Sequence, residues 1–258
     1  MTQQPEFPPS VLPERAILRI DGAEARQYLH NLVTADIEHL KDGEAAYGAL
    51  LSPQGKILAD FFILAEGDGF LIDCAASQKA DLLKRLAMYR LRAKIGIAEV
   101  ADLEVVVSPT SGRYRDPRLG LLGWRDMVPK GSVAEAAGYH AARIKAGLAD
   151  SDADLGSGEF FPHEANFDQF GGVSFTKGCY VGQEIVSRME HRGTARNRIL
   201  PVAMEAPKGT EIRSGEKVLG TVLSSAGGIS LAVLRLDRLD GAVKVLKPDW
   251  VRYDVPHE

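Results

Sequence analysis

The sequence predicts an α+β protein in which antiparallel sheets with flanking helices precede a small C-terminal β-barrel. Strand-like runs are joined by short turns and followed by amphipathic helices, without the regular strand–helix–strand alternation of a parallel sheet. From about residue 196 the pattern changes to short β-rich runs separated by Gly and Pro turns. The 258 residues, 45% hydrophobic and 26% charged, suffice for a buried core without disulfides or a structural metal.

The first lobe is predicted over roughly residues 1–98. A strand over 11–20 precedes an amphipathic helix over 23–33, whose apolar residues recur at helical spacing. Residues 45–64 predict two strands that form a hairpin at the turn Pro53-Gln54-Gly55.

The hairpin is followed by a third strand over 70–75 and a second amphipathic helix over 78–90. Residues 94–109 are rich in Ile and Val, and they predict further strands. These elements complete an antiparallel arrangement of sheet and helices.

The second lobe is predicted over 99–195. Residues 108–131 are expected to form turns around a short strand at 120–124, and a helix is expected over 132–147. The stretch 148–176 is dense in Gly, Asp and Phe. A loop of this length inside a compact domain is more often functional than disordered.

The third unit is predicted over 196–258, so that the chain divides into a two-lobed α+β body over 1–195 and a C-terminal unit over 196–258. Short β-rich runs alternate with turns, which is typical of a small barrel or sandwich. The predicted strands of this unit are 198–205, 217–225, 229–236, 242–246 and 250–253.

Composition excludes several classes of function. The net charge is −4 and the pI is near 5.9, so no overall basic field indicates nucleic acid or an anionic membrane as a partner. No apolar run approaches 18 residues, and the polar, Pro-rich start lacks the features of a signal peptide. We therefore expect a cytoplasmic, reduced protein. Two cysteines and six histidines without ligand spacing predict no stable metal site.

The densest chemistry lies in Lys177–Glu184, with the sequence KGCYVGQE. If a helix begins near Gly182, Cys179 precedes its N-terminus, where the helix dipole and the Lys177 ammonium both favour the thiolate. This combination predicts a reactive cysteine. The alternative is an inert, buried cysteine behind a helix start.

Residues 175–184, FTKGCYVGQE, resemble the signature of the YgfZ-type folate-binding proteins, which are similar to the T-protein (aminomethyltransferase) of the glycine cleavage system. The segment PHEANFD at 162–168 resembles the element that precedes this signature. Residues 28–37 and 51–57 resemble the family's N-terminal helix and hairpin. The resemblance covers nearly the whole chain in the expected order.

The resemblance implies a T-protein-like fold with ferredoxin-like halves, a C-terminal barrel and a central folate site. It implies tetrahydrofolate as ligand, a role in assembling or repairing iron–sulfur proteins, and an indirect influence on tRNA modification. Partners would then be iron–sulfur proteins or the cluster-assembly machinery, and we expect a monomer. Cys179 would be the reactive group, tuned by Lys177.

Two alternatives remain open. In a folate-dependent one-carbon transferase, a carboxylate such as Asp60 would steer protonation. T-proteins carry an acidic pair in this hairpin, and here Ala59 stands beside Asp60, which counts against that chemistry. In a non-catalytic folate-binding regulatory module, residues 177–184 would only shape the pocket.

The predicted cofactor-binding residues are polar or aromatic side chains placed beside the signature or on segments that resemble the family. For most of them a purely structural role, such as helix capping, turn formation or core packing, is an open alternative. They are Asn31, Thr34, Asp36, Tyr89, Glu164, Asn166, Asp168, Tyr180, Gly182, Gln183, Glu184 and Arg192.

One local basic run follows the signature, formed by Arg188, Arg192, Arg196 and Arg198. Such a run is often only a solvated face. The sharper hypothesis is that it binds the glutamate tail of a cellular folate through bidentate contacts. No aromatic residues interleave with these arginines, so nucleic acid is the weaker option.

Overall fold

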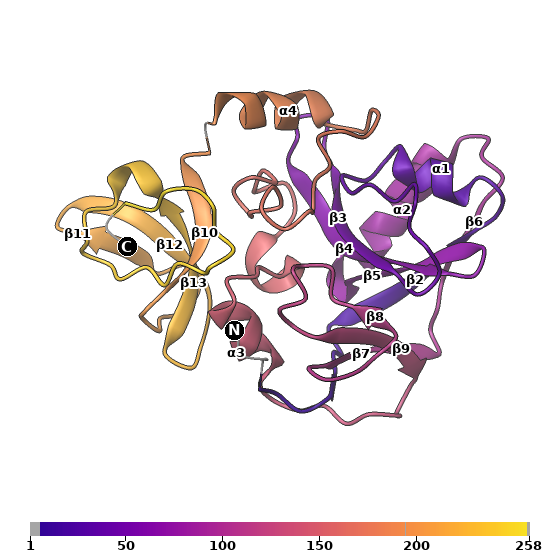
Figure 1. Cartoon of the computed structure of the whole chain (residues 1–258), viewed down its shortest axis with the longest axis horizontal. Helices are drawn as coiled ribbons and strands as arrows, with labels where there is room; N and C mark the ends of the chain where they lie inside the picture. The colour runs from indigo at the N-terminus through magenta and orange to yellow at the C-terminus, as the bar shows by residue number, and fades with distance from the viewer. Residues whose placement is uncertain (1–5, 194, 257–258) are drawn as a thin grey trace.

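The computed structural model describes residues 6–193 and 195–256, and these form three antiparallel sheets with flanking helices (Figure 1). The five-stranded sheet and the four-stranded sheet that contains β7 (Leu103–Ser108) and β9 (Trp124–Pro129) lie side by side. The other four-stranded sheet, near the C-terminus, lies at the opposite end of the molecule. The predicted α+β fold class is confirmed. None of the helices in the described part is long and apolar enough to cross a membrane.

The five-stranded sheet has the order β3-β4-β5-β2-β6. The predicted hairpin is confirmed, since Gly55 adopts a φ of +79° and the Ser52 N–H donates to the Lys56 carbonyl at 2.8 Å. The strands are β2 (Arg15–Asp21), β3 (Ala45–Leu51), β4 (Ile57–Glu66), β5 (Gly69–Ala75) and β6 (Gly96–Glu99).

Both faces of this sheet are buried along β4 and β5, whereas the edge strand β6 is largely exposed. One face packs under α1 (Ala25–His30) and α2 (Lys79–Arg90), which follows the short 3-10 turn η1 (Ala76–Gln78). The other face packs against the second sheet and the long loop before α4. Burial on two sides explains why β4 and β5 are apolar along nearly their whole length.

The second sheet has the order β1-β7-β9-β8. Its strands are β1 (Ser10–Val11), β7 (Leu103–Ser108), β8 (Tyr114–Arg115) and β9 (Trp124–Pro129). Two predictions are wrong here. The expected strand over 11–20 is divided between two sheets, because β1 pairs with β7 and β2 pairs with β5. The expected strand over 120–124 is a turn up to Gly123, because Leu119, Gly120 and Gly123 all adopt positive φ, and only Trp124 belongs to a strand, as the first residue of β9.

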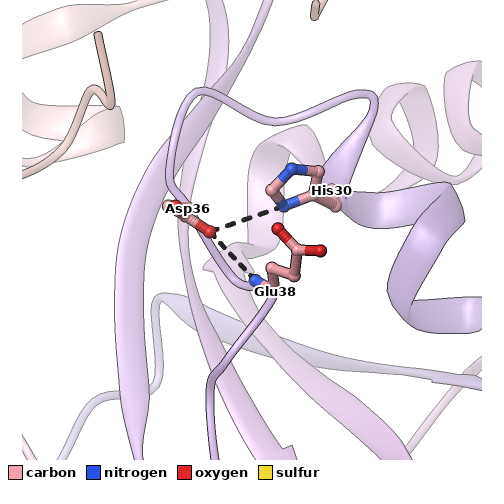
Figure 2. A group of neighbouring side chains, drawn as sticks. All are labelled: His30, Asp36 and Glu38. Atoms are coloured by element: carbon pink, nitrogen blue, oxygen red, sulfur yellow. Dashed lines mark hydrogen bonds and ion pairs between the residues drawn. The ribbon is translucent and has the colours of Figure 1, made fainter. Parts of the chain in front are cut away.

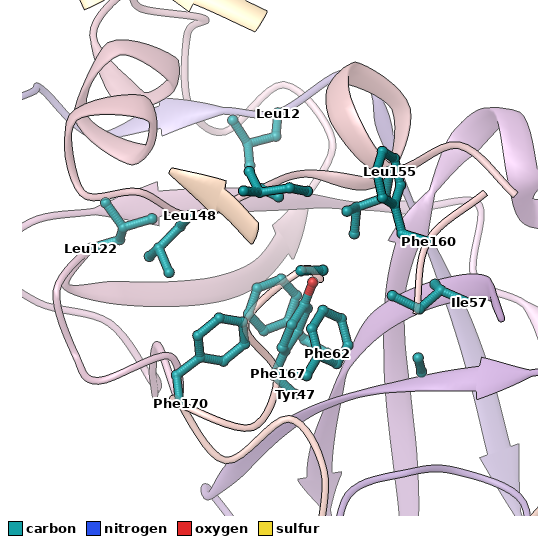
Figure 3. Packing of buried hydrophobic residues seen from close by; sticks show 14 of the residues in the cluster. Leu12, Tyr47, Ile57, Phe62, Leu122, Leu148, Leu155, Phe160, Phe167 and Phe170 are labelled. Atoms are coloured by element: carbon teal, nitrogen blue, oxygen red, sulfur yellow. The ribbon is translucent and has the colours of Figure 1, made fainter. Parts of the chain in front are cut away.

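The segment between the sheets is less helical than the sequence indicates. The expected helix over 132–147 begins only at α3 (Tyr139–Lys145), because Gly138 before it has a φ of +118°. A π-helical turn, η2 (Ser151–Leu155), follows. The irregular stretch beyond it carries Phe160, Phe167 and Phe170 into the main core. Phe167 and Phe170 contact Tyr47 of β3, whereas Phe160 lies beside Leu155 (Figure 3).

After α4 (Gln183–Arg192) the chain enters the third sheet, which has the order β10-β13-β12-β11. The expected strands at 242–246 and 250–253 are absent from the described structure, where only a bridge from Val202 to Val245 forms. The strands are β10 (Asn197–Val202), β11 (Glu211–Ser214), β12 (Lys217–Ala226) and β13 (Ile229–Arg235), followed by η3 (Leu236–Arg238).

Candidate functional site

The two cysteines lie in opposite environments. Cys179 is exposed and unpaired on the loop before α4. Cys74 is enclosed in β5, and burial raises the pKa of its thiol to about 12. At neutral pH Cys74 is therefore a protonated packing residue. Of the two thiols, only that of Cys179 is open to a partner.

Lys177 anchors the loop that carries Cys179. Its Nζ donates to the backbone carbonyls of His30, Val33 and Ala35, the last two at 2.6 and 2.9 Å. His30 is the last residue of α1, and Val33 and Ala35 lie in the segment after it. Carbonyls at the end of a helix have no partner within the helix. Burial lowers the pKa of Lys177 to about 8.

This geometry bears on the prediction that Lys177 tunes the Cys179 thiol. An ammonium has three N–H donors, and here each has a carbonyl acceptor in the segment after α1. The structure thus gives Lys177 a positioning role, since its hydrogen bonds go to the backbone and none goes to the thiol.

The side chain of Tyr180 packs from the loop into the main core. Its ring lies 5.2 Å from the Lys177 Nζ, and the side chain is buried in the main core. Burial raises the pKa of its hydroxyl to about 12, and the hydroxyl has no hydrogen-bond partner among the residues that the structure describes. Tyr180 is therefore not presented on an open surface as a platform for an aromatic ligand.

Gly182 fixes the start of α4 against the β3–β4 turn. Its φ is +81°, and a Cβ at this position would lie 2.6 Å from the carbonyl oxygen of Ser52. The predicted helix start is confirmed, and only glycine fits there. Gln183 is half-buried in the first turn, whereas Glu184 is exposed and pairs with Arg188 at 2.7 Å.

The predicted folate residues of the long loop hold it to the C-terminal sheet. The Asn197 side chain donates to Glu164 at 2.9 Å, and the Asn166 side chain donates to the Ile199 carbonyl at 2.7 Å. The Arg198 guanidinium donates hydrogen bonds to both carboxylate oxygens of Asp168, at 2.6 and 3.0 Å. All three polar side chains therefore hold the long loop against strand β10.

The basic run does not form a single surface. Arg198 is buried against Asp168 and the carbonyl of His163, and Arg188 pairs with Glu184. Arg196 is exposed. The side chain of Arg192, one of the predicted folate contacts, lies outside the described residues.

The remaining predicted folate contacts lie near α1 and α2. Thr34 is buried, and its hydroxyl donates to the Gly172 carbonyl at 2.6 Å. Asn31 is exposed at the C-terminus of α1, and Tyr89 is half-buried on α2. Asp36 lies 3.6 Å from His30, whose pKa is lowered by burial and by Lys177 (Figure 2). The described contacts of these residues fall into separate groups, and their assignment to a folate site stays a prediction.

Asp60 lies inside the protein with 2% of its surface exposed. Its carboxylate accepts hydrogen bonds from the hydroxyls of Tyr47 and Ser151, each at 2.5 Å. Burial raises its pKa, although the charge of Arg15 opposes the change. Neither described hollow of the protein is lined by Asp60.

Around Asp60 extends a buried ionic cluster that the sequence analysis missed. Arg15 and Arg125 both bind Asp73, at 2.6 and 2.5 Å. The only sequence signal was an aspartate inside the apolar strand FLIDCA. The buried ionic cluster comprises the cations Arg15, Arg118, Arg125 and Arg143 and the carboxyl groups of Asp60, Asp73, Asp116, Asp150 and Asp154.

Two of the hollows on the described surface are considered for a ligand. One, of about 260 Å³, lies between α4 and the C-terminal sheet and is lined by His163, Glu190, Arg198 and Tyr253 among others. The other, of about 500 Å³, is wide open beside Pro248. Neither is lined by Cys179, which stands on an open surface.

Two family models match this chain. The model described as the GCVT N-terminal domain matches residues 15–108, and the one described as the CAF17 C-terminal beta-barrel domain matches residues 196–253. The glycine cleavage system aminomethyltransferase T of Bartonella henselae superposes with a TM-score of 0.73, covering 95% of this chain and 82% of that one. At 12% identity this likeness shows the fold alone.

Three similar proteins share one name. The mitochondrial iron–sulfur cluster assembly factor IBA57 of Mus musculus is 31% identical over 92% of this chain and 83% of its own length. The human protein of that name is 29% identical over 90% and 78%, respectively. The homologue of Pyricularia oryzae is 31% identical over 88% and 72%.

These names correct one expectation. All three relatives are named as mitochondrial, which contradicts the cytoplasmic location inferred from composition. Composition describes a folded body whose charge and core suit either compartment, so it was a poor guide to location. The signature was predicted to indicate the YgfZ type, whereas the relatives bear the IBA57 name. The chain therefore belongs to the family of the IBA57 iron–sulfur cluster assembly factors, and it has the fold of the T-protein.

Proposed function

We propose that this protein takes part in the assembly of iron–sulfur clusters and that Cys179 contacts the cluster. The observation that carries the proposal is an exposed thiol on a loop whose neighbouring lysine is bound to three backbone carbonyls. The relatives at about 30% identity, named for cluster assembly, support the same role.

One thiol sets the form of this role. On contact, the thiol gives its proton to solvent, and the thiolate takes one coordination position on a cluster iron. A stable cluster needs about four such ligands, and the buried Cys74 is not available as a second one. The remaining ligands must come from a partner, so the partner is a thiol-bearing iron–sulfur protein or a component of the assembly machinery.

The test compares Cys179→Ser with Cys74→Ala in cells depleted of the native protein. We expect Cys179→Ser to leave iron–sulfur enzyme activity unrestored, while the purified variant unfolds at the denaturant concentration of the parent. Cys74→Ala should restore activity if it folds, because its thiol is enclosed. Full restoration by Cys179→Ser would overturn the proposed role of the thiol.

Tetrahydrofolate binding, polyglutamylated forms included, and an indirect influence on tRNA modification remain predictions from the YgfZ-type resemblance. Equilibrium dialysis of the full chain against tetrahydrofolate tests the first. Retained tRNA thiolation in cells that lack the protein would remove the second.

The one-carbon transferase alternative depends on Asp60. Its carboxylate is enclosed and already bonded to Tyr47 and Ser151, which counts against proton transfer to an external substrate. Methylene transfer from tetrahydrofolate by the parent protein, lost in Asp60→Asn, would favour this alternative over cluster assembly.

A further inference from the structure

We propose that His30, Asp36 and Glu38 form a binding site for a divalent transition-metal ion. The three residues lie at the end of α1 and on the loop that follows it (Figure 2). Cys179 is not a member of this group, and the inference does not rest on the proposed function. Sequence spacing did not reveal it, because the loop brings positions 36 and 38 back beside 30.

The geometry of the three side chains suits shared coordination. One ligand atom from each residue lies within 4.8 Å of the other two. The His30 Nδ1 is 3.6 Å from an Asp36 oxygen, and that oxygen accepts the Glu38 backbone N–H at 3.0 Å. With metal–ligand bonds of about 2.0–2.2 Å, tetrahedral ligand atoms lie about 3.4 Å apart, so small side-chain shifts close the site.

The second observation is the state of His30. This residue is 8% exposed, and its buried Nδ1 has no hydrogen-bond partner within residues 6–193 and 195–256. A buried ring nitrogen without a partner loses hydration, and a metal ion on its lone pair would restore an equivalent interaction. The dashed contact in Figure 2 shows this nitrogen directed at Asp36.

The nearby cation does not block the carboxylates. All three N–H groups of Lys177 go to backbone carbonyls, including that of His30 itself. Neither Asp36 nor Glu38 accepts a hydrogen bond from it. Both carboxylates are exposed and keep free lone pairs toward solvent.

A second cluster shows what a closed group of the same residue types looks like. His163, Asp168 and Glu190 also bring ligand atoms within 4.8 Å of one another. There Arg198 donates to both oxygens of Asp168, and the His163 Nε2 lies 3.0 Å from Glu190. The guanidinium already supplies the positive charge, so we assign no ion to that cluster.

The donor set selects the class of metal. One imidazole and two carboxylates suit Zn²⁺, Fe²⁺ or Mn²⁺ better than Ca²⁺ or Mg²⁺, which prefer oxygen ligands alone. Three protein ligands leave positions for water or for a group from a partner. The carboxylates face solvent, so the ion is expected to exchange readily.

The experiment uses the purified full chain and Co²⁺ as a spectroscopic probe, with Zn²⁺ in competition. We expect one Co²⁺ per chain, with visible absorption of nitrogen and oxygen ligation. Glu38→Gln and Asp36→Asn should weaken binding at least about tenfold, and His30→Gln should weaken it further. Glu38 is exposed, so its variant tests the site even if His30→Gln fails to fold.

Three controls define the outcome. Cys179→Ser, His163→Gln and Glu190→Gln should bind Co²⁺ as the parent does. Loss of binding in Cys179→Ser, or a sulfur–cobalt charge-transfer band, would place the ion at the thiol and overturn the site. Failure of the parent to bind one ion, or unchanged affinity in Glu38→Gln, would also overturn it.

Discussion

The buried ionic cluster around Asp73 and the loop around Cys179 use polar residues in opposite ways. In the cluster, charged side chains are enclosed and bind one another, as when Arg15 and Arg125 share Asp73. In the loop, a single buried cation, Lys177, binds backbone carbonyls, and the thiol two residues later is exposed.

The buried ionic cluster therefore supports the fold, whereas the loop around Cys179 can contact a partner. Charges taken out of water and paired with one another organise the interior, but they are closed to a partner. An exposed thiol beside a fixed anchor is open to a partner and keeps a defined position. The proposed function therefore depends on the loop rather than on the cluster. The following predictions test that division.

The largest effect is expected from Asp73→Asn. The change leaves Arg15 and Arg125 buried without their shared counter-ion, and breaking such a pair costs about 3–5 kcal/mol of unfolding free energy. Urea denaturation measures it. Glu211→Gln, which removes an exposed partner of Arg213, is the matched control and should change little. Equal stability of both variants would show that the cluster does not organise the interior.

Lys177→Met is expected to cost about 3 kcal/mol, because it leaves three carbonyls of the segment after α1 without their donor. The loop should also loosen, so limited proteolysis near Cys179 should accelerate. The exposed Lys84→Met is the control for loss of a lysine charge. If proteolysis and stability match the parent, Lys177 does not position the loop.

Gly182→Ala is expected to destabilise the protein by about 1–2 kcal/mol or more, since φ is +81° and the added Cβ meets the Ser52 carbonyl. Gly178→Ala is a control in the same loop, because a Cβ there has no atom within 4 Å. Thermal unfolding of the two variants measures the difference. Identical melting temperatures would contradict the packing of α4 against the hairpin turn.

The pH dependence of stability tests the state of Lys177. Its pKa is about 8 in the fold against an ordinary 10.5, so the unfolded chain holds more protons between these values. The contribution of Lys177 to stability therefore rises as pH increases from about 8 to 10.5, and it is constant below that window. Denaturation of the parent and Lys177→Met at pH 7 and 9.5 isolates it. A fall with pH, relative to the variant, would show that the fold stabilises the ammonium.

The smallest effect is expected from Cys179→Ser, which should change the unfolding free energy by less than about 0.5 kcal/mol, because the side chain is exposed. Cys74→Ser should cost more, since it places a hydroxyl in an enclosed strand. Chemical denaturation compares the two. A large loss of stability in Cys179→Ser would mean that the thiol has a structural role.

The sequence predicted those parts of the fold that local patterns determine. The hairpin over 45–64 and the helix start at Gly182 follow from turn glycines and hydrophobic periodicity. The helix over 132–147 failed because Gly138 and the packing around it interrupt a favourable pattern. The strand over 11–20 failed because residues close in sequence pair in different sheets.

The candidate site was predicted in part. The signature led to Cys179, and the structure shows that this thiol is exposed. The contacts of Glu164, Asn166 and Asp168 could not be predicted from the sequence. Their partners lie on β10, some 30 residues later in the chain. The same side chains suit a ligand or a docking contact, and only the position of β10 distinguishes the two.

By itself, the sequence determined the fold class and the order of most elements, and it singled out the segment that we propose carries the reactive group, because periodicity and turn chemistry act over a few residues. Only the tertiary structure decided which polar groups are enclosed and which remain open. Lys177 donates hydrogen bonds to the carbonyls of His30 and Val33, about 145 residues earlier in the chain. Arg15 of β2 forms an ion pair with Asp73 of the neighbouring strand β5. Burial and ion pairing depend on such distant neighbours, and they set the charge and the access that separate a structural side chain from a functional one.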